Sequence, residues 1–166
     1  ELANVDTQLN VRLAGATALA NRMRLKREQD WIKTYFAPGV WTTNYTGVAA
    51  TPAAGQVIRW DSFDTSTPVE DVTKAKTAMY LASGGAASYT DIVAVMTQDV
   101  FDVLVNHPAI IARMNGGSTV TNTTLITKAK LAEVFGVAEI LIPRAIGNKG
   151  KEGLADNHDF LVKNRF

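Results

Sequence analysis

The sequence predicts an α+β fold in which one long helix precedes a region of alternating strands and helices. Three observations support this prediction. Apolar residues recur at intervals of three and four between residues 2 and 27. Aromatic and β-branched residues then alternate with others between residues 41 and 60. From residue 67 to residue 142, short apolar runs alternate with segments that carry helix start and stop signals.

The long N-terminal helix is predicted by one narrow stripe of mainly apolar residues. These residues have the spacing of one face of an α-helix, and they are Leu2, Val5, Leu9, Leu13, Ala16, Ala20, Met23 and Arg27. No proline interrupts the segment before Pro38, so the predicted helix runs for about 35 residues and spans roughly 50 Å. We expect it to act as a strut that lies across a sheet or against neighbouring subunits.

The segment that follows Pro38 predicts two strands. Trp41, Thr43 and Tyr45 alternate with other residues in the first strand, and Ile58 and Trp60 alternate in the second. The stretch "AATPAAG" between them is rich in alanine, proline and glycine. We therefore expect a β-hairpin in which this loop joins the two strands.

A full set of helix signals follows in "TPVEDVTKAKTAMYLASGG". Thr67 is the predicted N-cap, Pro68 occupies the first helical position, and Glu70 completes a capping box. Gly84 or Gly85 is the predicted terminator, since glycine readily adopts the left-handed conformation that ends helices. These signals bound one helix on both sides.

Two apolar runs and two further helices complete the predicted α/β region. The runs "TDIVAVM" and "VAEILI" predict buried strands, and Pro143 ends the second. The segment "TQDVFDVLVNH" predicts a helix capped by Thr97. The segment "NTTLITKAKLAEVFG" predicts a helix capped by Asn122 or Thr121 and ended by Gly136.

The composition bounds the class of protein. The 166 residues, 46% of them apolar and 20% charged, suit one domain with a globular core. The 17 basic and 16 acidic side chains nearly cancel, so the net charge indicates neither a nucleic-acid binder nor a membrane-surface protein.

The absence of cysteine excludes disulfides and thiolate metal sites. No membrane span or signal peptide is visible, so no membrane partner is expected. Because the sequence starts with Glu1, we expect a processed or longer protein.

The 2 histidines are candidates for chemistry, but each has a structural interpretation. His107 precedes Pro108 at the end of a predicted helix, where it is expected to bind the last free carbonyl groups or complement the helix dipole. No nucleophile in a suitable motif accompanies it. His158 lies near Asp156 and Asp159, but this polar loop lacks the ligand spacing of a metal site. No catalytic, cofactor-binding or metal-binding residue is therefore assigned, and the chain is not expected to be an enzyme.

A basic cluster on the first helix is the candidate interaction site. It comprises Arg22, Arg24, Lys26, Arg27 and Lys33, opposed only by Glu28 and Asp30. At about 100° per residue, Arg22, Lys26 and Lys33 share one face beside the apolar stripe. Two interpretations stay open: a solvated flank with intrahelical pairs, or a surface that contacts DNA phosphates or acidic faces of neighbouring subunits. Neither implies recognition of a DNA sequence.

Several motifs follow one another in a specific order. The long helix contains "RMRLKREQDWIKTYF", and after it come "GVWTTNYTG", "VIRWDSFDTSTPVEDV", "TDIVAVMTQDVFDVLVNHPAIIARM" and "LAEVFGVAEILIPRAIGN". In this order and spacing, from about residue 9 to residue 153, the chain resembles the major capsid proteins of tailed bacteriophages. The resemblance implies the Hong Kong phage-type capsid fold, with a long spine helix in a peripheral domain and an α/β axial domain.

The resemblance also implies a domain organisation and partners. Residues 1–68 would form the peripheral domain with the spine helix and the β-hairpin, residues 69–145 the axial domain, and residues 146–166 an incomplete return toward the peripheral domain. The implied subunit assembles as pentamers and hexamers into an icosahedral shell around double-stranded DNA, without cofactors. Portal, scaffold or decoration proteins are further implied partners, and the implied location is the virion, assembled in the bacterial cytoplasm.

Two other functions compete with this interpretation. A cellular nanocompartment of the encapsulin type would use a similar shell subunit to package an enzyme instead of a genome. A small soluble α/β enzyme would need a pocket with convergent polar groups, for which the sequence offers no motif.

Overall fold

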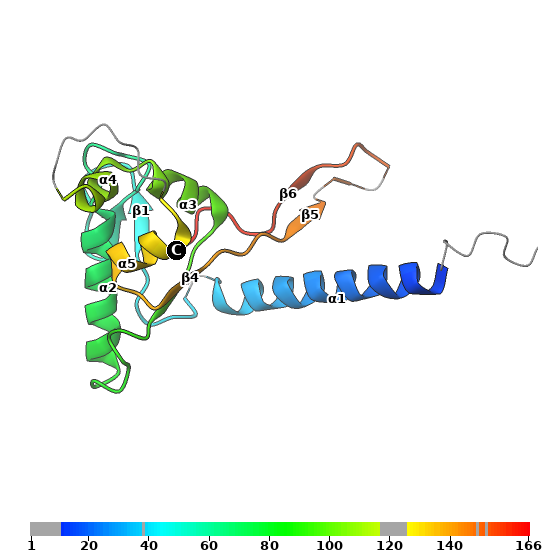
Figure 1. The fold of residues 1–166 in the computed structure, drawn as a ribbon, viewed down its shortest axis with the longest axis horizontal. Coiled ribbons are helices and arrows are strands. Elements are labelled where there is room, and N and C mark those ends of the chain that lie inside the picture. Colours follow the sequence, from blue (N-terminus) through cyan, green and yellow to red (C-terminus); the bar gives the residue numbers. More distant parts are fainter. Residues whose placement is uncertain (1–10, 38, 117–125, 149, 152) are drawn as a thin grey trace, which may run out of the picture. The chain divides into compact units, whose positions relative to one another are not determined.

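The structure is a computed structural model that describes residues 11–37, 39–116, 126–148, 150–151 and 153–166 (Figure 1). It divides into two compact units, Glu1–Val40 and Trp41–Phe166. The first unit contains helix α1 (Val11–Tyr35). The second contains, in chain order, β1 (Thr46–Val48), β2 (Gln56–Ile58), α2 (Pro68–Ala82), β3 (Val93–Val95), α3 (Gln98–Val105), α4 (Pro108–Met114), α5 (Lys128–Phe135), β4 (Glu139–Leu141), β5 (Ile146–Asn148) and β6 (His158–Phe160). The described residues thus form an α+β fold, as predicted.

Helix α1 confirms the predicted long helix over its described part. It has 25 residues, which corresponds to about 37 Å at 1.5 Å per residue. It ends before Pro38, the breaker that the sequence places there. Three members of the predicted stripe, Leu2, Val5 and Leu9, lie outside the described residues.

Strands β1 and β2 correct the expectation of a β-hairpin. They pair in parallel, with Thr46 opposite Gln56, whereas a hairpin is antiparallel. The connecting residues contain two positions with positive φ, Thr51 at 50° and Gly55 at 78°. The amide of Thr46 also donates to the carbonyl of Gly55 at 3.1 Å. The loop therefore carries the chain back beside its own starting point and does not reverse it in a tight turn.

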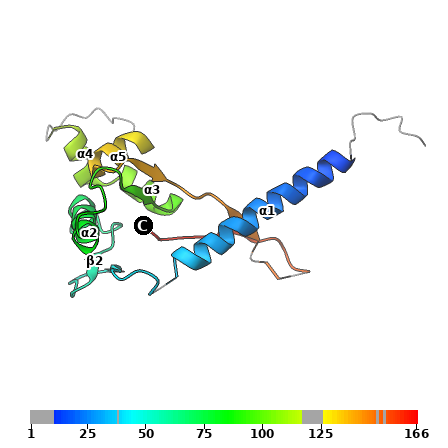
Figure 2. The same ribbon diagram turned by 90° about the horizontal axis from the view of Figure 1, so that it is seen from below.

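One hydrophobic core joins α2, α3, α4 and α5 with the β3–β4 pair in the second unit (Figure 1, Figure 2). Its buried members are Val69, Val72, Ala94, Met96, Leu104, Ile110, Ile126, Leu131, Ala132, Phe135, Val137 and Ile140. Leu104, Ile110 and Leu131 have no exposed surface. Burying side chains of this size contributes about 1.5–3 kcal/mol each, so this cluster is the main source of stability in the unit.

The two predicted central strands exist, but they are not buried on both faces. β3 and β4 pair in parallel, with Ala94 opposite Ile140, and both of these residues are buried. Their neighbours Val93 and Leu141 are 48% and 44% exposed. Side chains alternate between the faces of a strand, so only one face of this pair packs into the core.

Helix α2 begins and ends where its signals predict. Its proline occupies the first turn after Thr67, although the Thr67 side chain makes no capping hydrogen bond, so the expected capping box with Glu70 is not formed. Gly84 and Gly85 have φ values of 62° and 80°. The amide of Gly85 donates to the carbonyl of Tyr80 at 3.0 Å, which closes the helix end as glycine terminators do.

Helix α5 starts later than predicted. Its N-cap is Thr127, whose hydroxyl accepts a hydrogen bond from the amide of Lys130. The predicted caps Asn122 and Thr121 lie outside the described residues. The predicted end is confirmed, because Gly136 has φ 60° and ψ 43° in the left-handed region.

The last part of the chain contains an antiparallel pair that the sequence did not indicate. β5 and β6 pair with Asn148 opposite His158. The Asn148 side chain binds the connecting loop, since its Nδ2 donates to Asp156 and its Oδ1 accepts from the amides of Gly150 and Asn157 at 2.8 and 3.0 Å. One polar side chain therefore holds the loop in shape.

Residues 41–68 pack against the core of the second unit. The Trp60 ring lies 6.5 Å from that of Phe135, and Ser66 contacts His107, so residues 41–68 join the same core as residues 69–145. The chain end also belongs to this unit, because the Phe166 ring lies 4.8 Å from that of Trp60.

Candidate functional site

The predicted basic residues lie on the surface of α1. Arg22, Lys26 and Lys33 are exposed, and Lys26 forms an ion pair with Asp30 at 2.9 Å. Both partners are more than half exposed, so this pair contributes at most about 0.5 kcal/mol. The charge of Lys26 is thus partly balanced within the helix. Arg22 and Lys33 form no ion pair with any of the described residues.

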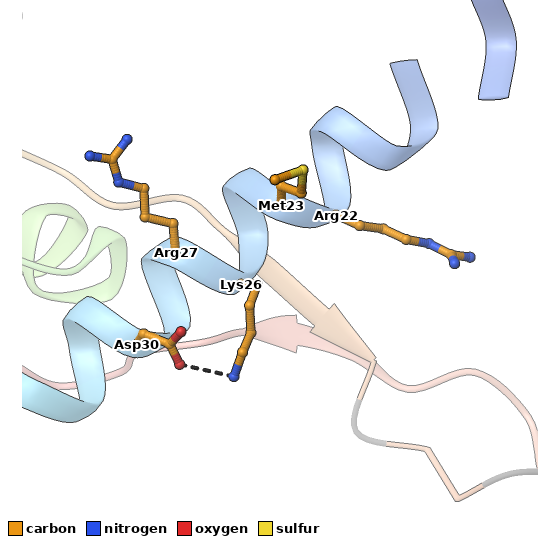
Figure 3. A pocket seen from close by; sticks show the side chains of 5 residues that line it. All are labelled: Arg22, Met23, Lys26, Arg27 and Asp30. Carbon is orange, nitrogen blue, oxygen red and sulfur yellow. Dashed lines mark hydrogen bonds and ion pairs between the residues drawn. The ribbon is translucent and has the colours of Figure 1, made fainter. Parts of the chain in front are cut away.

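A shallow depression lies beside this cluster and is lined by Arg22, Met23, Lys26, Arg27 and Asp30 (Figure 3). In Figure 3 the guanidinium groups of Arg22 and Arg27 point to opposite sides of the helix. All five residues belong to one helix. Apart from the Lys26–Asp30 ion pair, their polar groups do not converge, so the depression is suited to contact with an extended surface and not to enclosing a small molecule.

The same helix presents apolar side chains. Leu13 and Met23 of the predicted stripe are 63% and 65% exposed, and Leu19 is 60% exposed. Most of the stability of a helix in a protein comes from packing of its apolar face against other elements. Apolar and basic groups on one exposed helix therefore form a surface that a partner can cover, and we call it the α1 surface.

His107 has a different role from the one expected. It is fully buried and is the N-cap of the following helix, α4, where its Nδ1 accepts from the amide of Ala109 at 3.2 Å. Its Nε2 lies 2.9 Å from Oγ of Ser66, and that hydroxyl donates to the carbonyl of Ser62 at 2.7 Å. The ring also packs edge-to-face with Phe63, with centroids 5.5 Å apart. The imidazole thus joins two segments of the core.

These contacts fix the tautomer of His107. Since Nδ1 accepts a hydrogen bond, the ring proton is on Nε2, which donates to Ser66. Burial lowers the pKa of His107 below its ordinary value. The neutral ring is the form that the fold favours.

His158 and its acidic neighbours do not converge on one point. His158 is exposed at the start of β6. Asp156 accepts from Asn148, and Asp159 pairs with Lys163 at 2.7 Å. Over the residues that the structure describes, no three His, Cys, Asp or Glu side chains are grouped as a metal site would require.

Lys76 is a buried charged residue that sequence reasoning missed. It is 7% exposed, and its ammonium group donates to the carbonyl of Phe135 at 3.1 Å and to that of Gly136. It also lies 4.6 Å from the centre of the Tyr89 ring. Its acceptors are distant in sequence, so no local pattern marks the contact.

A second depression lies along α5 and β4. Its lining includes Lys128, Glu133 and Glu139, of which Lys128 and Glu139 form an exposed ion pair at 3.1 Å. No serine, threonine or histidine lines it.

Among the described helices, none is both long enough and apolar enough to cross a membrane.

Comparison with known proteins supports the fold alone. No protein-family model matches the chain, and no curated protein matches it. The crystal structure of a phage-related protein from Bordetella bronchiseptica is similar over 88% of this chain, with a TM-score of 0.64 and 20% sequence identity. This chain spans 41% of the length of that protein. The chain therefore has an α+β fold that it shares with part of a phage-related protein.

Proposed function

We propose that this chain is part of a major capsid protein of a tailed bacteriophage, with the Hong Kong phage-type fold, and that it assembles into an icosahedral shell around double-stranded DNA. The observation that carries the proposal is the structural likeness to a phage-related protein over most of the chain. The motif order described above points to the same family.

The α1 surface supports an assembly function. A separate helical unit with exposed Leu13, Leu19 and Met23 gains stability when another surface buries these side chains, as happens when subunits associate. Rings of identical subunits close when each edge fits the next copy. In this proposal the subunits form pentamers and hexamers, and the shell requires neither cofactor nor catalysis.

Basic residues beside the apolar stripe suit contact with DNA phosphates or with an acidic edge of a neighbour. Such contacts are independent of DNA sequence and weaken as salt increases. Portal, scaffold or decoration proteins are further partners that the proposal allows, and the virion is the proposed location.

The test is to express the protein and examine it by analytical ultracentrifugation and electron microscopy. We expect ring-shaped oligomers or closed particles, with nuclease-protected DNA when the phage packaging proteins are present. Cages filled with protein would favour the nanocompartment function instead. A stable monomer under every assembly condition, together with turnover of a small molecule, would favour the enzyme.

A further inference from the structure

The buried His107 ring is the only direct polar link described between the turn at residues 62–66 and the first turn of α4. It donates to Ser66 and accepts from Ala109. We propose that His107 is a proton-sensitive latch: the neutral ring holds these two segments together, and uptake of a proton releases them from each other.

A proton can add to the ring at one atom. In the neutral tautomer Nε2 carries the hydrogen that Ser66 accepts, so the free lone pair is on Nδ1. That lone pair receives the amide hydrogen of Ala109 at 3.2 Å. Protonated Nδ1 would direct a second hydrogen at this amide, and the hydrogen bond that caps α4 would become a repulsive contact.

In its buried position, the positively charged His107 ring would have no acidic partner. It would lie at the N-terminus of α4, where the helix dipole disfavours cations, and beside Leu104 and Ile110, both fully buried. The exposed charged groups on the surrounding elements are Asp61 and Asp64 in the turn, Glu70 and Lys74 in α2, Asp102 in α3, Arg113 in α4, and Lys128, Lys130 and Glu133 in α5. Three charged groups on these elements are less exposed: Asp71 accepts from the Trp60 ring, Asp99 accepts from the amide of Asn164, and Lys76 donates to the carbonyl of Phe135. No ion pair or hydrogen bond between them and the imidazole is present among the described residues.

The charged ring is therefore more stable in water than in the core, so it leaves its site. That movement also removes the hydrogen bond to Ser66, because the same ring makes both contacts. The turn of residues 62–66 leads directly into α2. Acid thus separates α4 from the segment that begins α2, and α4, which has lost its cap and its contact with the turn, opens more often.

The direction of the pH effect follows from the lowered pKa. A released or unfolded His107 takes up its proton near the ordinary value of 6.5, whereas the latched ring takes it up only at lower pH. Between these two values the open state binds more protons than the closed state. Opening is therefore favoured as pH falls below 6.5 and becomes about tenfold more frequent per pH unit within this interval.

Hydrogen exchange of the full chain, followed by mass spectrometry between pH 8.0 and pH 5.0, tests the latch. We expect protection of residues 108–114, corrected for intrinsic exchange rates, to decrease below pH 6.5 in the unmodified protein. His107→Asn places an amide oxygen where Nδ1 caps α4 but cannot titrate, so its protection should not respond to pH. His158→Gln removes the exposed imidazole and should behave like the unmodified protein.

An equal pH response in the unmodified protein and in His107→Asn would overturn the proposal. If His107→Asn does not fold, the exchange rate of the His107 C2 hydrogen in the unmodified protein gives the answer directly. A protonation midpoint below 6.5 that coincides with loss of α4 protection supports the latch, and a midpoint at or above 6.5 overturns it.

Discussion

The ammonium nitrogen of Lys76, in the middle of α2, lies 3.1 Å from the carbonyl oxygen of Phe135 at the end of α5. It also binds the carbonyl of Gly136, the residue that terminates α5. The last carbonyl groups of a helix lack partners within it, and this side chain supplies one. A single buried lysine therefore ties two helices of the core together.

Replacing this lysine should destabilise the second unit. Lys76→Met keeps most of the side-chain volume but leaves the buried carbonyl of Phe135 and the partly buried carbonyl of Gly136 without their charged donor, so we expect a loss of about 1.5–3 kcal/mol in the free energy of unfolding. Lys74→Met, at an exposed position of the same helix, should change it by less than about 0.5 kcal/mol. Urea unfolding measures both, and equal losses would contradict the role given to Lys76.

Two threonine caps provide a second comparison. The Thr127 hydroxyl accepts from the amide of Lys130, whereas the Thr67 side chain makes no capping hydrogen bond. We expect Thr127→Ala to lower the free energy of unfolding by about 1 kcal/mol and Thr67→Ala to leave it within about 0.5 kcal/mol. A larger loss for Thr67→Ala in thermal unfolding would mean that its cap forms in solution.

Local signals in the sequence predicted both ends of α2 and the end of α5, whereas α4 was not predicted. Pro68 and Gly85 bound α2, and Gly136 ends α5, because each restricts or permits a backbone conformation regardless of distant residues. The parallel pairing of β1 with β2 was not predictable in the same way. It depends on the left-handed conformations of Thr51 and Gly55, and threonine rarely adopts one.

The site residues were harder to predict, for the same reason. His107 was interpreted as the end of one helix, but the proline after it is equally a signal for the first turn of the next helix, with the histidine as its cap. Ser66, which binds the other nitrogen of the His107 ring, is 41 residues away, and the carbonyls that bind Lys76 are 59 and 60 residues away. Contacts at this separation follow from the packed core, and no local pattern specifies them.

The apolar part of the α1 surface should matter for association and not for folding. Leu13→Ala with Met23→Ala removes side chains that are 63% and 65% exposed, so the melting temperature of the subunit should hardly change. The yield of assembled particles should fall if these residues contact another subunit. Leu104→Ala, in contrast, opens a cavity at a fully buried site and should cost about 2–5 kcal/mol. Unchanged particle yield in the double variant would exclude the apolar stripe from the interface.

The basic part of the α1 surface makes a prediction about salt. If Arg22, Lys26 and Lys33 contact phosphates, replacing all three by glutamine should reduce the dependence of DNA binding on salt, lowering the slope of log affinity against log salt by about 2.7. Asp30→Asn should have the opposite effect, because it frees Lys26 from its ion pair.

The matched control for this experiment is the triple variant Lys74→Gln, Arg113→Gln and Lys130→Gln, which removes the same charge from exposed positions outside α1. Binding of double-stranded DNA is measured by fluorescence anisotropy from 50 to 300 mM salt. The long-range attraction of the protein to DNA depends mainly on the protein's net charge. It should therefore weaken equally in both triple variants. Only direct contact by α1 makes the slope fall more in the α1 variant than in its control, and identical slopes would leave the basic flank as a solvated helix face.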